Sequence, residues 1–228
     1  MELKEKHGRF IMVPSVQQSL ITTVEIFSKK CQQLARHRNP NIYLRSNDEL
    51  FSDWFENGLE SYNILKLGAN AHPDLIANGV GIELKSLKTN GQIQFNSTIP
   101  CGGFRHGIHS GECYYAVARY TVERNNGYLE DFTICDGDFF NHDRELAFSH
   151  ANEQETGFGD YGDGVVRHRK MYSFPSPLRT VPGISLISKY SDADAYDPDL
   201  ILDGEIIRTD IRGNQIPFFV YRHNLLRN

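Results

Sequence analysis

The first apolar pattern in the chain has helical spacing. Apolar residues recur on one face from Val16 to Leu34, at intervals of three and four positions. Ser15 and Gln18 precede most of this run with the spacing of a capping box, in which side chains satisfy the free backbone amides at a helix start. The pattern breaks in residues 36–40, so we predict one long amphipathic helix that begins after Ser15 and ends there.

A second helical pattern occupies residues 50–62, after another capping box formed by Ser46 and Glu49. At about 100° per residue, Glu49, Glu56 and Glu60 fall together on the face opposite the apolar one. A polar face of this kind is usually solvated. The alternative is that one of these glutamates points into an active site.

After Gly68 the period changes, and apolar residues alternate with polar ones as they do in strands. Residues 125–127 mark a hairpin between two of these segments. Together with the two predicted helices, we interpret these strands as one α/β domain. The predicted strands are 74–77, 80–87, 113–123, 128–135, 184–190, 200–207 and 216–221.

Residues 136–182 have little periodicity and are rich in glycine, aspartate and histidine, apart from a short helical pattern at 144–151. We interpret this segment as a long loop-rich excursion outside the core. No repeat or linker divides the chain. We therefore expect one domain over residues 1–228, with a core at about 45–135 completed by the C-terminal strands in 184–221.

The dipeptide Asn78-Gly79, flanked by alternating apolar residues, is a strong signal for a two-residue β-hairpin. Such a turn fixes the pairing of the two strands, and counting outward places Asp74 directly opposite Glu83. Alternation puts Lys85 on the same face as Glu83. Two carboxylates and one amine should therefore meet on one face of an otherwise apolar hairpin.

Two opposed carboxylates destabilise a strand pair unless a positive charge lies between them. A divalent cation fits this position, because magnesium takes oxygen ligands and is commonly held by one or two carboxylates with water and phosphate. It can activate a water molecule and stabilise the charge that develops on a phosphodiester, and a neighbouring lysine can orient that water. The hairpin therefore predicts a site for phosphodiester hydrolysis.

These residues resemble the PD-(D/E)xK nucleases. Pro73-Asp74 is followed after eight residues by Glu83-Leu84-Lys85, and the continuation ELKSLKTNGQIQFNSTIP is similar to type II restriction endonucleases in particular. The resemblance covers about residues 45–120. It implies a mixed central β-sheet flanked by helices and a sequence-specific endonuclease that cuts double-stranded DNA as a homodimer.

The same resemblance implies roles for individual residues. Asp74 and Glu83, with Leu84 beside them, would bind Mg²⁺, for which Mn²⁺ can substitute. Lys85 would assist the attacking water. A glutamate from the preceding helix often joins such sites; Glu60 is the candidate, and the choice between Glu60 and Glu56 stays open.

Three alternatives remain open at this point. The hairpin can be an exposed one with an ordinary Glu–Lys pair, because loose matches to the motif occur by chance. The protein can be a repair or junction-resolving nuclease with the same core. It can also be a DNA-binding module without cleavage activity.

The formal net charge of −5, from 24 Lys and Arg against 29 Asp and Glu, argues against a protein that coats nucleic acid by bulk charge. Two stretches, 84–111 and 164–189, nevertheless contain basic residues and no acidic ones. Their basic and amide side chains are of types that contact phosphates or base edges. The predicted DNA-contacting residues are Lys88, Gln94, Asn96, Ser97, Thr98, Arg105, His106, Arg167, Arg169 and Lys170.

A second segment, Pro198 to Glu205, looks like the nuclease motif but has Ile207 where a lysine is needed. We predict a strand hairpin there, with Asp203-Gly204 as its turn. A histidine-metal nuclease site at His142 or His223 is not favoured, because neither has a second partner at a suitable spacing.

The four cysteines have no CxxC spacing, so reduced thiols are the simplest expectation. Cys101, His106, His109 and Cys113 are of zinc-binding type but lack the paired spacing of structural zinc sites, and polar loop residues are the default interpretation.

The first residues of the chain mix both charge signs, and no apolar stretch has the length of a secretory signal or a membrane span. We therefore expect a cytoplasmic protein with no membrane partner.

Overall fold

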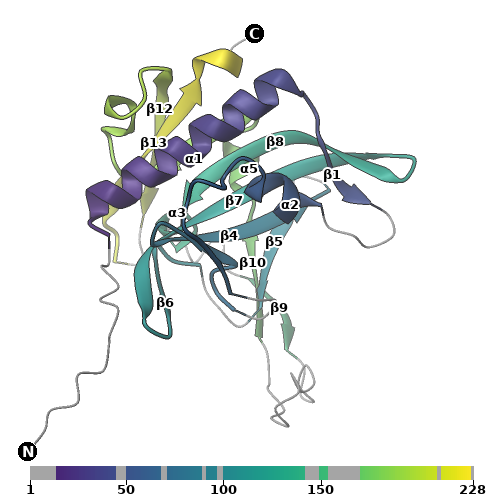
Figure 1. Cartoon of the computed structure of the whole chain (residues 1–228). Helices are drawn as coiled ribbons and strands as arrows, with labels where there is room; N and C mark the ends of the chain where they lie inside the picture. Colours follow the sequence, from purple (N-terminus) through teal and green to yellow (C-terminus); the bar gives the residue numbers. More distant parts are fainter. Residues whose placement is uncertain are drawn as a thin grey trace, which may run out of the picture.

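The computed structural model describes residues 14–44, 50–67, 71–88, 91–96, 100–141, 149–153, 170–209 and 212–226. These residues form an α/β fold around a large mixed β-sheet, with few helices (Figure 1). The fold class predicted from the sequence is confirmed.

The large sheet has ten strands in the order β12-β13-β11-β8-β7-β4-β3-β2, and β1 and β6 pair with β8 and β7 beside that path. The pairs β4–β7 and β8–β11 are parallel, and the other pairs are antiparallel. The strands are β1 (Asn41–Leu44), β2 (Ile64–Lys66), β3 (Leu75–Ala77), β4 (Val80–Leu87), β6 (Gly103–His106), β7 (His109–Glu123), β8 (Asn126–Asp136), β11 (Ile184–Ser188), β12 (Leu200–Thr209) and β13 (Gln215–His223).

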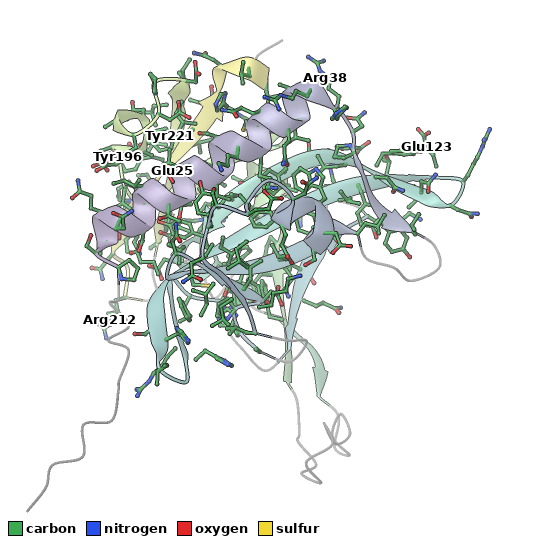
Figure 2. All side chains as sticks on the ribbon, in the orientation of Figure 1. Glu25, Arg38, Glu123, Tyr196, Arg212 and Tyr221 are labelled. Atoms are coloured by element: carbon green, nitrogen blue, oxygen red, sulfur yellow. The ribbon has the colours of Figure 1, made fainter. Side chains whose placement is uncertain are left out.

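Helix α1 (Val16–Arg36) lies across one face of this sheet (Figure 1). Its start is as predicted: the Ser15 hydroxyl accepts a hydrogen bond from the backbone amide of Gln18 at 3.1 Å. The apolar face of the helix packs into a cluster with the sheet, and Tyr221 of β13 lies beside it in Figure 2. The buried helix residues include Leu20, Val24, Ile26, Phe27, Cys31 and Leu34.

Helix α2 (Phe51–Glu56) is much shorter than the pattern in residues 50–62 predicts. It ends at Asn57, and Gly58 follows with a φ of +84°, a left-handed conformation that ends helices. The apolar residues beyond Gly58, Leu59 and Tyr62, are buried without being helical. The predicted capping pair of Ser46 and Glu49 lies outside the described residues.

The predicted strands all occur, with shifts at their ends, but the strands at 41–44, 64–66, 92–96, 103–106, 149–153 and 170–175 were not predicted. The predicted turn at Asp203-Gly204 is wrong, because β12 runs through these residues with a bulge between Leu202 and Gly204. Pairing with β13 continues on both sides of the bulge, from Leu200 to Thr209. A Gly after Asp can mark a bulge as well as a turn, and local sequence does not separate the two.

The opposite face of the large sheet carries a second layer. It contains a three-stranded sheet in the order β5-β10-β9 with the short helices α3 (Asp138–Asn141) and α5 (Pro177–Thr180). The strands are β5 (Gln92–Asn96), β9 (Ser149–Glu153) and β10 (Lys170–Pro175).

Both ends of the predicted excursion 136–182 belong to this second layer, so the expectation that the segment lies outside the core is wrong there. Phe139 and Phe140 at one end, and Phe174 and Leu178 at the other, are buried in a common cluster with β5. Of the predicted helix 144–151, residues 144–148 lie outside the described residues, and residues 149–151 are in β9.

The remaining elements are two single turns of 3₁₀ helix, η1 (Ala193–Ala195) and η2 (Asn224–Leu226), which follow β11 and β13. Among the described residues, no helix combines the length and apolar character needed to cross a membrane.

Candidate active site

The β3–β4 hairpin has the register that its sequence predicts. Leu75 pairs with Ile82, Ile76 with Gly81, and Ala77 with Val80. Asn78 and Gly79 both have positive φ, 49° and 86°, as a type I′ turn requires. Asp74 stands one residue before β3, at the level of Glu83.

The two faces of the hairpin meet different layers. Val80, Ile82 and Leu84 belong to the cluster under α1. Glu83 and Lys85 alternate with them and therefore face the layer of β5 and β10. The predicted gathering of acidic and basic side chains on one face is confirmed by their contacts.

Glu83 is held on both sides. The Lys85 ammonium donates to Glu83 Oε1 at 2.6 Å, and His72 Nδ1 lies 3.0 Å from Glu83 Oε2. Asp74 Oδ2 accepts a hydrogen bond from the backbone amide of Leu84 at 2.6 Å. Asp74, Glu83 and Lys85 thus form one polar cluster with His72, which the sequence reasoning missed.

The two carboxyl groups differ in charge behaviour. Burial, and then the negative charge of Glu83, raises the pKa of Asp74 to about 6, although the Leu84 amide and Lys85 act in the other direction. Burial also raises the pKa of Glu83, but the His72 hydrogen bond and Lys85 outweigh it, so the pKa is lowered below its usual value. Below about pH 6 the pair therefore favours a single negative charge, on Glu83, and a cation bound by both carboxylates would favour ionisation of Asp74 as well.

Aromatic and sulfur-containing side chains surround this cluster. Lys85 Nζ lies 5.6 Å from the centre of the Phe95 ring of β5, and His72 Nε2 lies 3.8 Å from Cys113 Sγ. Burial raises the pKa of the Cys113 thiol well above its usual value, so the thiol is neutral. The Phe104 ring lies against Gly81 and next to Pro73, since a Cβ added at Gly81 would meet both within 3 Å.

Glu56 and Glu60 are not part of this cluster, and Glu49 lies outside the described residues. Glu60 lies beyond the end of α2, where its carboxylate accepts from the Gly58 amide at 2.9 Å. The Gly58 amide and then the charges of Lys30 and Lys29 lower its pKa. Glu56 pairs with Lys66 at 2.7 Å.

Glu56, Glu60 and Lys66 together line a surface hollow of about 470 Å³ that includes neither Asp74 nor Glu83. The prediction that Glu56 and Glu60 share one face of a helix is wrong, because α2 ends at Glu56 and the chain turns at Gly58, before Glu60.

Several of the predicted DNA-contacting residues lie on elements next to the cluster. Lys88 is exposed just after β4, Gln94 is exposed on β5, and Arg105 is exposed on β6 beside the partly buried His106. Asn96 and Lys170 are at the paired ends of β5 and β10, where Asn96 is the partner of Met171. Ser97, Thr98, Arg167 and Arg169 lie outside the described residues.

The cluster lies between two β-ribbons. The β6–β7 hairpin and the β5-β10-β9 sheet extend in the same direction, away from α1 (Figure 1). Phe104 at the base of the first ribbon lies next to Pro73, and Phe95 in the second lies over Lys85. Arg105 belongs to the first ribbon, and Lys88 directly follows β4, the strand that carries Glu83 and Lys85.

Lys189 belongs to the second basic stretch of the sequence but is occupied inside the protein. Its ammonium lies 3.0 Å from Asp138 Oδ2, 3.4 Å from Glu112 Oε1 and 3.5 Å from Asp136 Oδ2. Burial, only partly offset by the charge of Lys189, raises the pKa of Asp136 to about 7. This lysine is therefore unavailable to a polyanion.

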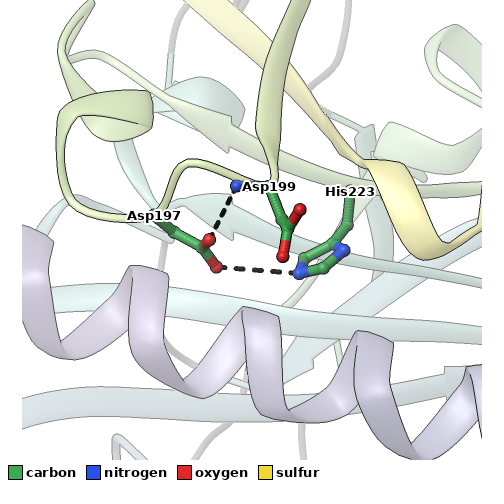
Figure 3. Close-up of side chains that lie close together, drawn as sticks. All are labelled: Asp197, Asp199 and His223. Atoms are coloured by element: carbon green, nitrogen blue, oxygen red, sulfur yellow. Dashed lines mark hydrogen bonds and ion pairs between the residues drawn. The ribbon is translucent and has the colours of Figure 1, made fainter.

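A third polar cluster lies at the C-terminal end of β13 (Figure 3). His223, for which the sequence offered no partner, lies with Asp197 and Asp199, and the ligand atoms of all three are within 4.8 Å of one another. The expectation of an isolated histidine is wrong, because the pairing of β12 with β13 brings distant residues together.

Comparisons with known proteins give no relative. No protein-family model matches the chain, and neither the curated proteins nor the solved structures include a match. Function must therefore be argued from the residues and the geometry of the sites.

Proposed function

We propose that this protein is a magnesium-dependent, sequence-specific endonuclease of double-stranded DNA, of the type II restriction kind, acting as a homodimer. The observation that carries the proposal is the meeting of Asp74, Glu83 and Lys85 on one face of the β3–β4 hairpin. A surface Glu–Lys pair does not explain the arrangement, because Asp74 is partly buried and its pKa is raised by burial and by Glu83.

The residues of the cluster fit a magnesium ion. Asp74 and Glu83 offer the carboxylate oxygens that Mg²⁺ prefers, with the remaining positions left for water and a DNA phosphate. When bound, the ion would supply Lewis acidity towards the phosphate and the attacking water. Mn²⁺ takes similar ligands and can substitute.

The chain's own residues hold and orient these groups. His72 fixes one oxygen of Glu83, and the Leu84 amide fixes Asp74, so both carboxylates are oriented before any ligand arrives. Lys85 is near enough to Glu83 to orient a water molecule beside it or to contact the scissile phosphate.

The two ribbons supply a surface for a duplex. Lys88 and Arg105 provide positive charge for phosphates, and the exposed Gln94 of β5 is a residue type that reads base edges. A β-ribbon can enter a major groove, which is about 12 Å wide. In a homodimer each copy would cut one strand.

The decisive experiment is digestion of phage DNA with purified protein and Mg²⁺. We expect discrete bands that disappear with EDTA, and calcium, which prefers more ligands, should support binding without appreciable cutting. Cleavage restricted to branched or damaged duplexes would favour a repair or junction-resolving enzyme. Binding without cutting under all these conditions would favour a DNA-binding module, and cutting in EDTA would contradict the mechanism.

A further inference from the structure

We propose that Asp197, Asp199 and His223 form a second metal site, which takes a divalent transition-metal ion of the zinc or manganese kind. The site joins the end of β13 to the turn before β12 (Figure 3). It is separate from the Asp74–Glu83 pair and does not depend on the proposed nuclease function.

Strand pairing brings the three residues together. Leu200, the first residue of β12, pairs with His223, the last residue of β13. Asp199 therefore stands beside the end of β13, and its carbonyl accepts from the Asn224 amide at 2.9 Å. Asp197 Oδ1 accepts from the Asp199 amide at 2.9 Å, so the two carboxyl groups are held on one tight turn.

His223 is the observation that points to a ligand. The residue is only 2% exposed, and among the described residues its Nε2 atom has no hydrogen-bond partner. Leaving a buried polar atom unsatisfied costs about 1–3 kcal/mol. Figure 3 shows that this atom points towards the two aspartates, so its missing partner belongs between them.

The spacing suits a metal better than a direct hydrogen bond. His223 Nε2 lies 3.6 Å from Asp197 Oδ2, which is beyond the usual hydrogen-bond range of about 2.7–3.2 Å. In a tetrahedral site with bonds of about 2.0–2.1 Å, ligand atoms lie about 3.3–3.4 Å apart. The distance between Asp197 and His223 is close to that value, and the ligand atom of Asp199 lies within 4.8 Å of both.

The donor set selects the kind of ion. One imidazole and two carboxylates suit Zn²⁺ or Mn²⁺, whereas Mg²⁺ and Ca²⁺ prefer oxygen ligands alone. Asp199 is exposed, so an ion can enter from solvent and keep a water molecule as a further ligand.

Neighbouring groups determine how the ligands are held. The Ser28 hydroxyl of α1 donates to Asp197 Oδ2, which ties the site to the long helix. His223 Nδ1 accepts from the Leu225 amide at 3.3 Å, so the ring proton is on Nε2. An ion bound at Nε2 would require the ring proton to sit on Nδ1, so the Leu225 amide would lose this acceptor and η2 would have to readjust.

The test is isothermal titration of EDTA-treated, dialysed protein with ZnCl₂ and with MnCl₂, in the Asp74→Ala/Glu83→Ala background that removes the proposed catalytic ligands. We expect one saturable site per chain for at least one of the two ions. Affinity should fall at least tenfold in Asp199→Asn and in His223→Gln. The ion should also raise the unfolding temperature of the Asp74→Ala/Glu83→Ala protein, the parent in this test, but not that of the same protein with Asp199→Asn or His223→Gln added.

Two matched controls isolate the site. His109→Gln changes a histidine of the β6–β7 hairpin, and Glu205→Gln changes an exposed carboxylate of β12; both should bind as the parent does. Asp199→Asn keeps the test valid if His223→Gln fails to fold, because Asp199 is exposed. No saturable binding in the parent, or unchanged affinity in Asp199→Asn, would overturn the proposal, as would loss of binding in His109→Gln.

Discussion

The negative charge of Glu83 contributes to the raised pKa of Asp74, and both carboxyl groups are candidate Mg²⁺ ligands, which makes them the most sensitive positions of the proposed site. Asp74→Ala or Glu83→Ala should abolish cleavage, because each removes one of the two carboxylates that would hold Mg²⁺. Lys85→Ala should lose most of the activity. Cleavage rates measured with Mg²⁺ on a duplex substrate check all three.

Glu205→Ala is the matched control for these substitutions. Glu205 belongs to the second, lysine-free copy of the motif and is exposed on β12, so its removal should leave the rate unchanged. Circular dichroism would establish that each variant is folded. Full activity in folded Asp74→Ala or Glu83→Ala would remove the basis of the site assignment.

Asp136 gives a pH prediction of its own. Three carboxyl groups compete for the single charge of Lys189, and Asp136, which is 1% exposed, is the most buried of them. Its pKa of about 7 in the folded protein lies above its ordinary value of 3.8. The folded state therefore binds this proton more tightly than the unfolded chain does, and the contribution of Asp136 to the free energy of unfolding falls as pH rises from about 4 to about 7.

Asp136→Asn carries no titrating proton at this position and should lose that part of the pH dependence. Its free energy of unfolding relative to the parent should improve by on the order of 2–4 kcal/mol between pH 4 and pH 8. Urea denaturation of both proteins at several pH values measures the difference. A constant difference across this range would mean that Asp136 is ionised throughout.

At the scale of elements, the predictions that succeeded rest on local signals. Asn78-Gly79 fixes the register of β3 and β4 because only residues that tolerate positive φ can form that turn. Ser15 begins α1 because its hydroxyl reaches an amide three residues ahead. Both signals act within a few residues, so the sequence alone carries them.

The features that sequence reasoning missed depend on contacts between distant segments. His72 joins the site because its ring reaches Glu83 across the hairpin. In the sequence it stands directly before Pro73-Asp74, and only this closeness to the motif could have pointed to it. His223 meets Asp197 only through the pairing of β12 and β13. Gly58 ended α2 early, although apolar periodicity continued past it.

The hairpin turn can be tested directly. Gly79→Ala should destabilise the protein by about 1–2 kcal/mol, because φ is +86° at this position and an added Cβ would meet the Pro14 ring within 3 Å. Gly204→Ala is the control, since a Cβ there has nothing within 4 Å. Urea midpoints measure both, and equal midpoints for the two variants would contradict the turn geometry.

At the scale of the whole molecule, an acidic protein must concentrate its positive charge on one surface to bind DNA. Several of its basic side chains are instead paired with carboxylates or backbone carbonyls of the same chain. Lys189 faces three carboxylates, Arg222 pairs with Asp203, and Lys30 donates to the carbonyls of Trp54 and Asn57 at the end of α2. If the protein binds DNA, the exposed Lys88, just after β4, and the exposed Arg105, on β6, must therefore supply more of the phosphate-contacting charge than the composition suggests.

This distribution predicts how binding responds to salt. Each phosphate contact contributes about 0.9 to the slope of log affinity against log salt concentration. Lys88→Ala and Arg105→Ala should each weaken binding to every duplex and flatten that slope by about 0.9. Lys66→Ala should change neither quantity, because Lys66 pairs with Glu56 of α2. The slopes are measured by titrating calcium-loaded protein with cognate and unrelated duplexes at several salt concentrations. If Lys88→Ala and Arg105→Ala have the affinity and the salt slope of the unsubstituted protein while Lys66→Ala does not, the DNA lies on the α2 side and not between the two ribbons.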